Sequence, residues 1–219
     1  ALWYLSSAGH KSRHILREFA PNLVIGTGGY VSGPVVLSAA KQGIPTAIHE
    51  QNAFPGVTNK ILAKQVDAVF AAMPDAVEKL GVPHKTIVTG NPVRPEILRA
   101  DREGARAKLG VRPGQVCLLS FGGSLGARTI NQVVADLAAW HIRERDFFHI
   151  HATGGYGVEL FHDLCQEKGI LGDSHLLVKE YIDDMASCLA AADLVISRSG
   201  AITISELAAA GREIGRAHV

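Results

Sequence analysis

Short apolar segments alternate with amphipathic stretches along nearly the whole chain, and this alternation constrains the fold more than any other feature of the sequence. The apolar segments are brief and rich in β-branched side chains, which is typical of buried strands, whereas the stretches between them have helical spacing. Repeated strand–helix–strand units imply parallel sheets joined by right-handed crossovers. The sequence therefore predicts an α/β protein.

Two blocks of this alternation are separated by a segment rich in proline and charge. We expect strands at 23–26, 46–49, 68–71, 86–88, 116–121, 147–151, 176–178 and 194–197, and helices at 34–41, 58–64, 75–80, 102–109, 127–140, 158–168, 183–191 and 202–210. Asp75 and Asp183 are the predicted N-caps of their helices. We interpret 1–95 as the C-terminal part of one Rossmann-like domain, 96–114 as a linker and 115–212 as the N-terminal part of another. Both domains are expected to be incomplete.

Composition narrows the possible functions. The 219 residues carry a formal net charge of +1, which does not favour nucleic acid as a partner. No apolar run reaches the roughly 20 residues of a membrane-spanning helix, and residues 1–5 are too short for the core of a signal peptide. The three cysteines, Cys117, Cys165 and Cys188, lack the spacing of a metal site. We expect them to be reduced thiols in a reducing compartment.

A glycine-rich segment, 121–127, follows a predicted strand and opens a predicted helix. Glycines allow the backbone to approach an anion closely, and a helix N-terminus offers unpaired N–H groups and the positive end of its dipole. Ser124 adds a hydroxyl donor, so the loop suits a diphosphate. A tight turn without a ligand is the alternative, because the segment matches neither a Walker loop nor the GxGxxG fingerprint.

Three further segments follow predicted strands and are expected at the carboxyl edge of a sheet, where ligands of parallel α/β proteins bind. Segment 26–34 is either a loop for a polar substrate or a flexible turn. Segment 49–52 either contacts sugar hydroxyls or is a loop capped by its own amides, and His49 alone is more often structural. Arg94, in segment 90–94, either pairs with a phosphate or is a surface residue of a hinge.

Glu206 lies near the start of the last predicted helix, after segment 197–205. It is either a capping-box acid or a carboxylate that accepts hydrogen bonds from ribose hydroxyls. No residue pattern suited to a metal stands out, and we expect no metal and no cofactor. Helix dipoles and hydroxyl groups would then have to stabilise charge on a leaving group.

Six segments occur here in a specific order: 26–34, 49–52, 90–94, 122–127, 181–185 and 197–206. Together they closely resemble the UDP-N-acetylglucosamine–N-acetylmuramyl-(pentapeptide) pyrophosphoryl-undecaprenol N-acetylglucosamine transferase family, over nearly the whole span 21–211. The resemblance implies a GT-B fold and inverting transfer of N-acetylglucosamine from the UDP-sugar to the lipid-linked muramyl-pentapeptide in peptidoglycan synthesis, hence a role in cell shape and division. It also implies a peripheral position on the cytoplasmic face of the bacterial plasma membrane.

The resemblance also implies the substrate-binding residues. Asn52 and Arg94 would contact the donor or its sugar, Ser124 the diphosphate and Ile182 the uracil. The nucleotide sugar would be bound by Ala201, Ile202, Thr203, Ile204, Ser205 and Glu206, with Glu206 on the ribose. The histidine proposed for the family's chemistry belongs to a loop upstream of this sequence, so the catalytic residue is unknown.

Two departures and two alternatives accompany this interpretation. Residues 213–219 differ from the apolar strand of the family and are expected to be a non-native tail. We expect the chain alone to be inactive. The alternatives are another GT-B UDP-sugar transferase and a non-catalytic nucleotide-binding module, since Rossmann-like sheets host many functions. Segments 28–33 and 49–52 argue against the first alternative.

Overall fold

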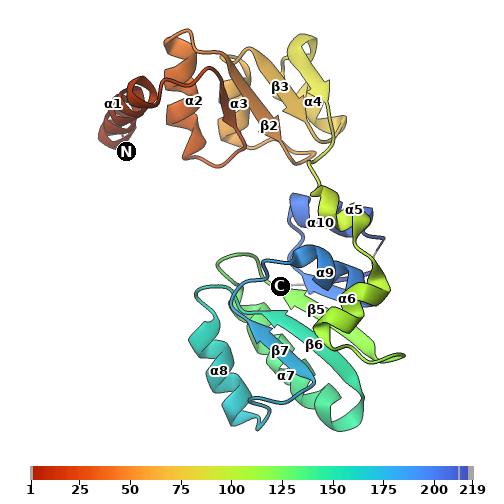
Figure 1. Cartoon of the computed structure of the whole chain (residues 1–219). Helices are drawn as coiled ribbons and strands as arrows, with labels where there is room; N and C mark the ends of the chain where they lie inside the picture. The colour runs from red at the N-terminus through yellow and green to blue at the C-terminus, as the bar shows by residue number, and fades with distance from the viewer. Residues whose placement is uncertain (1, 212, 217–219) are drawn as a thin grey trace. The chain divides into compact units, whose positions relative to one another are not determined.

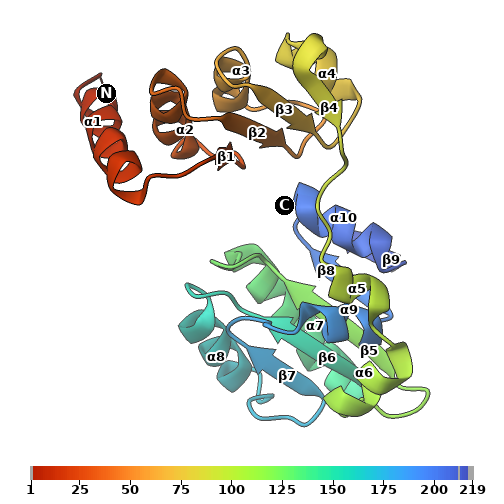
Figure 2. The same cartoon turned by 45° about the horizontal axis from the view of Figure 1, so that its top comes forward.

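The computed structural model describes residues 2–211 and 213–216, which divide into two compact units, here called unit 1 (to Pro92) and unit 2 (from Val93). Figure 1 and Figure 2 show each unit as a sheet flanked by helices. The two parallel-sheet units confirm the predicted α/β fold class.

Unit 1 is built on a parallel sheet with the strand order β1-β2-β3-β4. Its elements are α1 (Leu2–Phe19), β1 (Val24–Gly26), α2 (Ser32–Lys41), β2 (Thr46–Glu50), α3 (Val57–Ala63), β3 (Ala68–Ala71), α4 (Asp75–Leu80), the 3₁₀ helix η1 (Pro83–Lys85) and β4 (Thr86–Val88). Successive helices pack on one another, and aliphatic side chains such as Ile48, Leu62 and Val69 form the core beneath them. The carboxyl ends of the four strands therefore share one edge.

Unit 2 has a second parallel sheet, with the order β7-β6-β5-β8-β9. Its elements are α5 (Pro95–Arg99), α6 (Arg102–Leu109), β5 (Val116–Phe121), α7 (Arg128–Glu144), β6 (Phe147–Ala152), α8 (Val158–Glu167), β7 (Leu176–Lys179), α9 (Met185–Ala191), β8 (Leu194–Ser197), α10 (Ala201–Ala209) and β9 (Glu213–Arg216).

Unit 2 has two separate cores, and alternate residues of β5 and β6, which share one face of the sheet, belong to the first of them. Cys117 and Leu119 join the core that includes α6 and α9, whereas the core under α7 and α8 is built around Val134, Ala138 and Phe161. Burial raises the pKa of the Cys117 thiol to about 12. All three cysteines are buried and free, as expected for inert thiols.

Every expected strand and helix is present, and most boundaries agree within two residues. The predicted N-caps are wrong: Asp75 is the first helical residue after Pro74, and Asp184 rather than Asp183 caps α9, by accepting a hydrogen bond from the Ser187 amide at 3.0 Å. Helices α1 and α5 were not expected.

Residues 213–216 form strand β9, paired in parallel with β8, although they differ from the apolar strand expected of the family. The backbone amides and carbonyls of β8 need partners whatever side chains the neighbouring strand carries, so a segment without an apolar pattern can still pair. Its origin as a non-native tail stays a prediction. Residues 217–219 lie outside the described residues.

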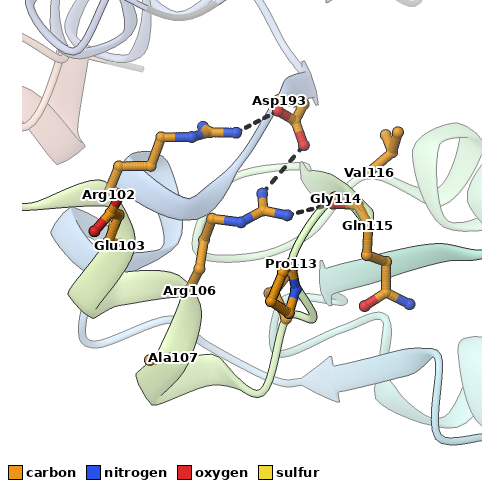
Figure 3. A pocket seen from close by; sticks show the side chains of 10 residues that line it. Arg102, Glu103, Arg106, Ala107, Pro113, Gly114, Gln115, Val116 and Asp193 are labelled. Atoms are coloured by element: carbon orange, nitrogen blue, oxygen red, sulfur yellow. Dashed lines mark hydrogen bonds and ion pairs between the residues drawn. The ribbon is translucent and has the colours of Figure 1, made fainter.

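The segment interpreted as a linker is part of unit 2, which begins at Val93 rather than after residue 114. Ile97, Ala105 and Val111 are buried in the unit-2 core. Figure 3 shows Arg102 and Arg106 reaching from α6 to Asp193, which precedes β8.

Both of these arginines also donate to backbone carbonyls at the C-terminal end of α9. Arg102 Nη1 lies 3.0 Å from Ala192 O, and Arg106 Nη1 lies 3.0 Å from Ala191 O. They line a cavity of about 690 Å³ at the amino edge of the sheet. Both guanidinium groups bond to Asp193 and to these carbonyls, and these bonds anchor α6.

Candidate functional site

The strand order of unit 2 creates a crevice at one defined place. From the central strand β5 the chain continues to β6 and β7 on one side, and then crosses to β8 on the other side. Ligands of open α/β sheets bind at such a switch point, outside the carboxyl ends of the two diverging strands. A cavity of about 260 Å³ lies there, lined by Phe121, Gly122, Gly123, Ser124, Leu125, Gly126, Arg198, Gly200 and Thr203.

The loop after β5 approaches its surroundings so closely that glycine is required. A Cβ on Gly122 would lie 2.4 Å from Ala127 N, and one on Gly126 would lie 2.2 Å from Thr153 O. Gly123 and Gly126 also have positive φ angles of 92° and 86°. Ser124 is exposed at the tip of this loop, which leads directly into α7. Its backbone geometry suits the approach of an anion to a helix N-terminus.

The predicted segment 201–206 forms the first two turns of α10, immediately after β8. Thr203 lines the same cavity as Ser124, and Glu206 follows one helical turn later. Helix α10 starts at Gly200 without a side-chain cap, so the capping-box interpretation of Glu206 is wrong. The structure thus brings the glycine loop and the first turns of α10 to one crevice.

Arg94 and Glu206 form a two-point ion pair within unit 2. Arg94 Nε lies 2.8 Å from Glu206 Oε1, and Arg94 Nη2 lies 3.2 Å from Glu206 Oε2. The hydrogen bonds that Arg94 donates to Glu206 raise the pKa of Arg94. The Glu206 side chain is 13% exposed and the Arg94 side chain 48%. This planar, charge-assisted arrangement fixes the orientation of the carboxylate.

In unit 1, the buried carboxylate of Glu50 organises the loop that carries Asn52. Glu50 is 2% exposed. Its Oε1 accepts hydrogen bonds from the backbone and side-chain nitrogens of Asn52 at 3.0 and 3.2 Å. Its Oε2 accepts from Gly56 N at 3.1 Å and Asn59 Nδ2 at 2.8 Å. Asn52 is exposed, and its two bonds to Glu50 hold it in a defined orientation.

His49 joins three loops at the carboxyl edge of the unit-1 sheet. Its Nε2 lies 3.1 Å from Gly90 O, and a carbonyl can only accept, so Nε2 carries the proton. Gln51 Nε2 donates to His49 Nδ1 at 3.1 Å and to Thr27 O at 2.8 Å. Both ring nitrogens are occupied, which supports the structural role for His49.

Ile182 is placed differently from the other predicted residues. Its side chain is 3% exposed and packs into the core of unit 2 beside α9, whereas the neighbouring Tyr181 is exposed. A contact with uracil therefore stays a prediction.

Sequence reasoning missed the turn 153–157, which braces the glycine loop. Gly155 N donates to Ser124 O and Tyr156 N donates to Leu125 O, each at 3.2 Å. Three glycines within five residues directly after a strand were the available signal. It also missed a buried polar network in β5, β6 and α7, described below.

Within residues 2–211 and 213–216, no group of three or more His, Cys, Asp or Glu side chains is arranged to hold a metal ion. None of the helices in this described part is long and apolar enough to cross a bilayer.

The strand order of unit 2 and its glycine loop at the switch point define a doubly wound, Rossmann-like α/β protein. Two family models match the chain: the glycosyltransferase family 28 N-terminal domain over residues 1–71 and its C-terminal domain over residues 117–214. The chain belongs to glycosyltransferase family 28, and its two parallel-sheet units correspond to the GT-B fold.

Curated relatives carry the name UDP-N-acetylglucosamine–N-acetylmuramyl-(pentapeptide) pyrophosphoryl-undecaprenol N-acetylglucosamine transferase. The protein from Acetivibrio thermocellus is 47% identical over 202 residues, 92% of this chain and 54% of its own length. The protein from Listeria welshimeri is 43% identical over 94% of this chain and 55% of its own. The chain thus spans about half the length of these relatives.

Among solved structures, MurG from Acinetobacter baumannii matches with a TM-score of 0.59 and 29% identity, covering 95% of this chain and 56% of that one. UDP-N-acetylglucosamine 2-epimerase from Rickettsia bellii matches with a TM-score of 0.68 and 20% identity, covering 98% of this chain and 61% of that one. The second likeness shows the fold alone.

Proposed function

We propose that the chain is part of an enzyme that transfers N-acetylglucosamine from UDP-N-acetylglucosamine to undecaprenyl-pyrophosphoryl-N-acetylmuramyl-pentapeptide, with unit 2 binding the donor. The observation that carries the proposal is the convergence of Ser124 and Thr203 on one cavity at the switch point of the sheet. The names of the curated relatives support this donor and this acceptor.

In this proposal the loop 122–126 and the N-terminus of α7 hold the diphosphate. As the acceptor hydroxyl attacks the anomeric carbon, the bond to the diphosphate oxygen breaks and negative charge grows on the leaving UDP. Loop amides and the helix dipole then stabilise that charge. Ser124 adds a hydroxyl donor from the tip of the loop.

Glu206 recognises the ribose in this proposal, and the two hydrogen bonds from Arg94 orient its carboxylate. Each Glu206 oxygen accepts one bond from Arg94 and retains a further lone pair for a ribose hydroxyl. Asn52 contributes a sugar contact from unit 1. The remaining proposed donor contacts are Ile182 to the uracil and Ala201, Ile202, Thr203, Ile204 and Ser205 to the nucleotide sugar. The general base stays unassigned.

A peripheral position on the cytoplasmic face of the bacterial membrane is also part of the proposal. Helix α1 carries a cluster of basic side chains, Lys11, Arg13 and Arg17, with the exposed apolar Ile15 and Phe19 nearby. A basic face with apolar neighbours favours contact with an anionic lipid surface.

Nucleotide binding by this chain tests the donor part of the proposal. We expect UDP and UDP-N-acetylglucosamine, but not ADP, to raise its melting temperature, because a ligand that binds only the folded state stabilises it. Glu206→Gln should weaken UDP binding by about 10- to 150-fold, since a hydrogen bond to a charged group contributes about 1.5–3 kcal/mol. Glu159→Gln, an exposed acid on α8, is the matched control.

Equal stabilisation by UDP and ADP, or unchanged affinity in Glu206→Gln, would contradict the assignment of this crevice. Transfer by the longer protein to a muramyl-pentapeptide lipid, but not to a soluble sugar acceptor, separates the proposal from another GT-B transferase. Binding of UDP by the longer protein without any transfer would favour a non-catalytic module.

A further inference from the structure

Five polar side chains form a continuous hydrogen-bonded chain inside unit 2, and the roles described above use none of them. They are Ser120 in β5, Asn131 and His141 in α7, and His149 and His151 in β6, and each is 0% exposed. Ser120 is paired in register with His151, so the strand residues of this buried network share the sheet face that α7 covers.

The direction of the first bonds follows from the carbonyl of Thr153, which can only accept. Asn131 Nδ2 donates to Thr153 O at 3.0 Å, and this fixes the orientation of the amide. The Asn131 Oδ1 atom then faces His151 Nε2 at 3.2 Å, so His151 Nε2 carries the proton. His151 Nδ1 is left to accept from Ser120 Oγ at 2.7 Å.

The same logic fixes the rest of the network. Because the Ser120 hydroxyl proton is donated to His151, Ser120 Oγ accepts from His149 Nε2 at 2.8 Å. His149 Nδ1 then accepts from His141 Nε2 at 3.2 Å. His141 Nδ1 is buried without a hydrogen-bond partner in the described part of the chain. All donors therefore point one way, from His141 to Thr153.

The three imidazole rings are neutral at physiological pH. Burial lowers the pKa of His151 to about 4 and lowers those of His149 and His141 as well, with further lowering of His149 by its histidine neighbours. A neutral ring has one donor and one acceptor nitrogen, so each of the three is locked as the Nε2–H tautomer.

The network ends at the turn that supports the glycine loop. A Cβ on Gly126 would lie 2.2 Å from Thr153 O. A Cβ on Gly157 would lie 2.3 Å from Thr153 O and 2.1 Å from Asn131 Nδ2. From this turn, Gly155 N donates to the carbonyl of Ser124 and Tyr156 N donates to the carbonyl of Leu125. Asn131 therefore holds the turn, and the turn holds the loop.

We propose that the buried network is a positioning device, in which Asn131 and His151 fix the turn 153–157 and, through it, the backbone around Ser124. Its consequence for ligand affinity rests on the proposed function of that loop in binding diphosphate. A buried hydrogen-bond network that permits only one arrangement of donors and acceptors fixes the positions of its side chains more narrowly than apolar packing of similar shape does.

Four variants test this inference. Asn131→Leu removes the hydrogen bond to Thr153 O, and His151→Leu removes the Nε2–H that donates to Asn131 Oδ1. Leucine keeps the approximate side-chain volume in both variants. His151→Gln retains a donor nitrogen at the position of Nε2. Cys165→Ala, which removes a buried atom from α8 in the same core, is the control for packing loss.

We expect amide exchange at Gly155 and Tyr156 to accelerate about tenfold in both leucine variants, the effect of losing about one hydrogen bond, and UDP affinity to fall by a similar factor. His151→Gln and Cys165→Ala should stay near the wild type in both measurements. Unchanged exchange in the leucine variants, or equal acceleration in Cys165→Ala, would overturn the inference. If the wild type failed to bind UDP, the proposed function would fall, and the exchange rates would still decide whether the network holds the turn.

Nitrogen-15 spectra of the histidine rings give a test that needs no variant. The inference requires the neutral Nε2–H form for His141, His149 and His151 at pH 7. A charged ring or an Nδ1–H form at His149 or His151 would break the one-way chain and refute it.

Discussion

At the residue scale, partners decide what each polar side chain can do. Glu50 and His49 belong to segment 49–52, for which sugar contacts and a self-capped loop were the two alternatives, and the bonds of both are directed to loops of unit 1. Glu206 keeps accepting capacity beside its two bonds from Arg94. The proposed recognition of a ligand therefore rests on Glu206, in α10, rather than on Glu50, at the end of β2, although both acids are largely buried.

The acid stability of unit 2 should depend on His151. The folded chain keeps this ring neutral down to a pKa of about 4, whereas the unfolded chain protonates it near pH 6.5. The stability it contributes is therefore full above about pH 6.5 and is lost as the pH falls toward 4, by roughly 3 kcal/mol. His151→Gln should lose less stability over this range in urea unfolding followed by circular dichroism.

The control for this prediction is His84→Gln, which changes an exposed histidine in unit 1. It should show the acid dependence of the wild type.

The ring of His151 is enclosed by Ser120, Asn131 and the ring of Phe161, whose centroid lies 4.3 Å from that of His151. Its nearest titratable neighbour in the network is His149. An identical loss of stability in wild type and His151→Gln would show that the ring takes up its proton without opening the core.

At the scale of elements, local patterns predicted the strands and helices well because each pattern is short and self-contained. Helix α1 was missed although its apolar residues have helical spacing, and β9 was missed because residues 213–216 lack the apolar pattern of a strand. The glycine loop after β5 was found because positive φ angles and close approaches favour glycine, whereas the turn 153–157 was missed although it carries the same signal.

Gly126 offers a prediction about the contact between the glycine loop and the turn 153–157. Gly126→Ala adds a Cβ 2.2 Å from Thr153 O at a φ of 86°, so both backbone strain and a clash with backbone atoms are expected. Gly169→Ala, at a φ of 68° with no atom within 4 Å, adds the strain alone. We expect a loss of about 1–2 kcal/mol for Gly169→Ala and at least ~2 kcal/mol more for Gly126→Ala.

Chemical denaturation of both variants measures this difference. Equal losses would mean that the turn 153–157 moves away without cost and does not brace the loop.

At the scale of the whole molecule, sequence alone predicted two α/β blocks but misplaced the segment between them. Arg102 and Arg106 pair with Asp193, about 90 residues later, and no local pattern indicates such a bond. The buried network escaped notice for the same reason: Ser120, Asn131 and His151 are ordinary residues until the sheet and α7 bring them together. The site residues were predicted through family resemblance combined with the edge-of-sheet rule.

The central claim is that the crevice between the ends of β5 and β8 binds the diphosphate nucleotide. Titration of the isotope-labelled chain with UDP, followed by amide chemical shifts, tests it most directly. We predict shifts at Gly122–Ala127 and Gly200–Glu206, and none at Gly114–Val116 or Asp193 on the opposite edge of the same sheet. Shifts confined to that opposite edge, or no shifts at millimolar UDP, would contradict the account.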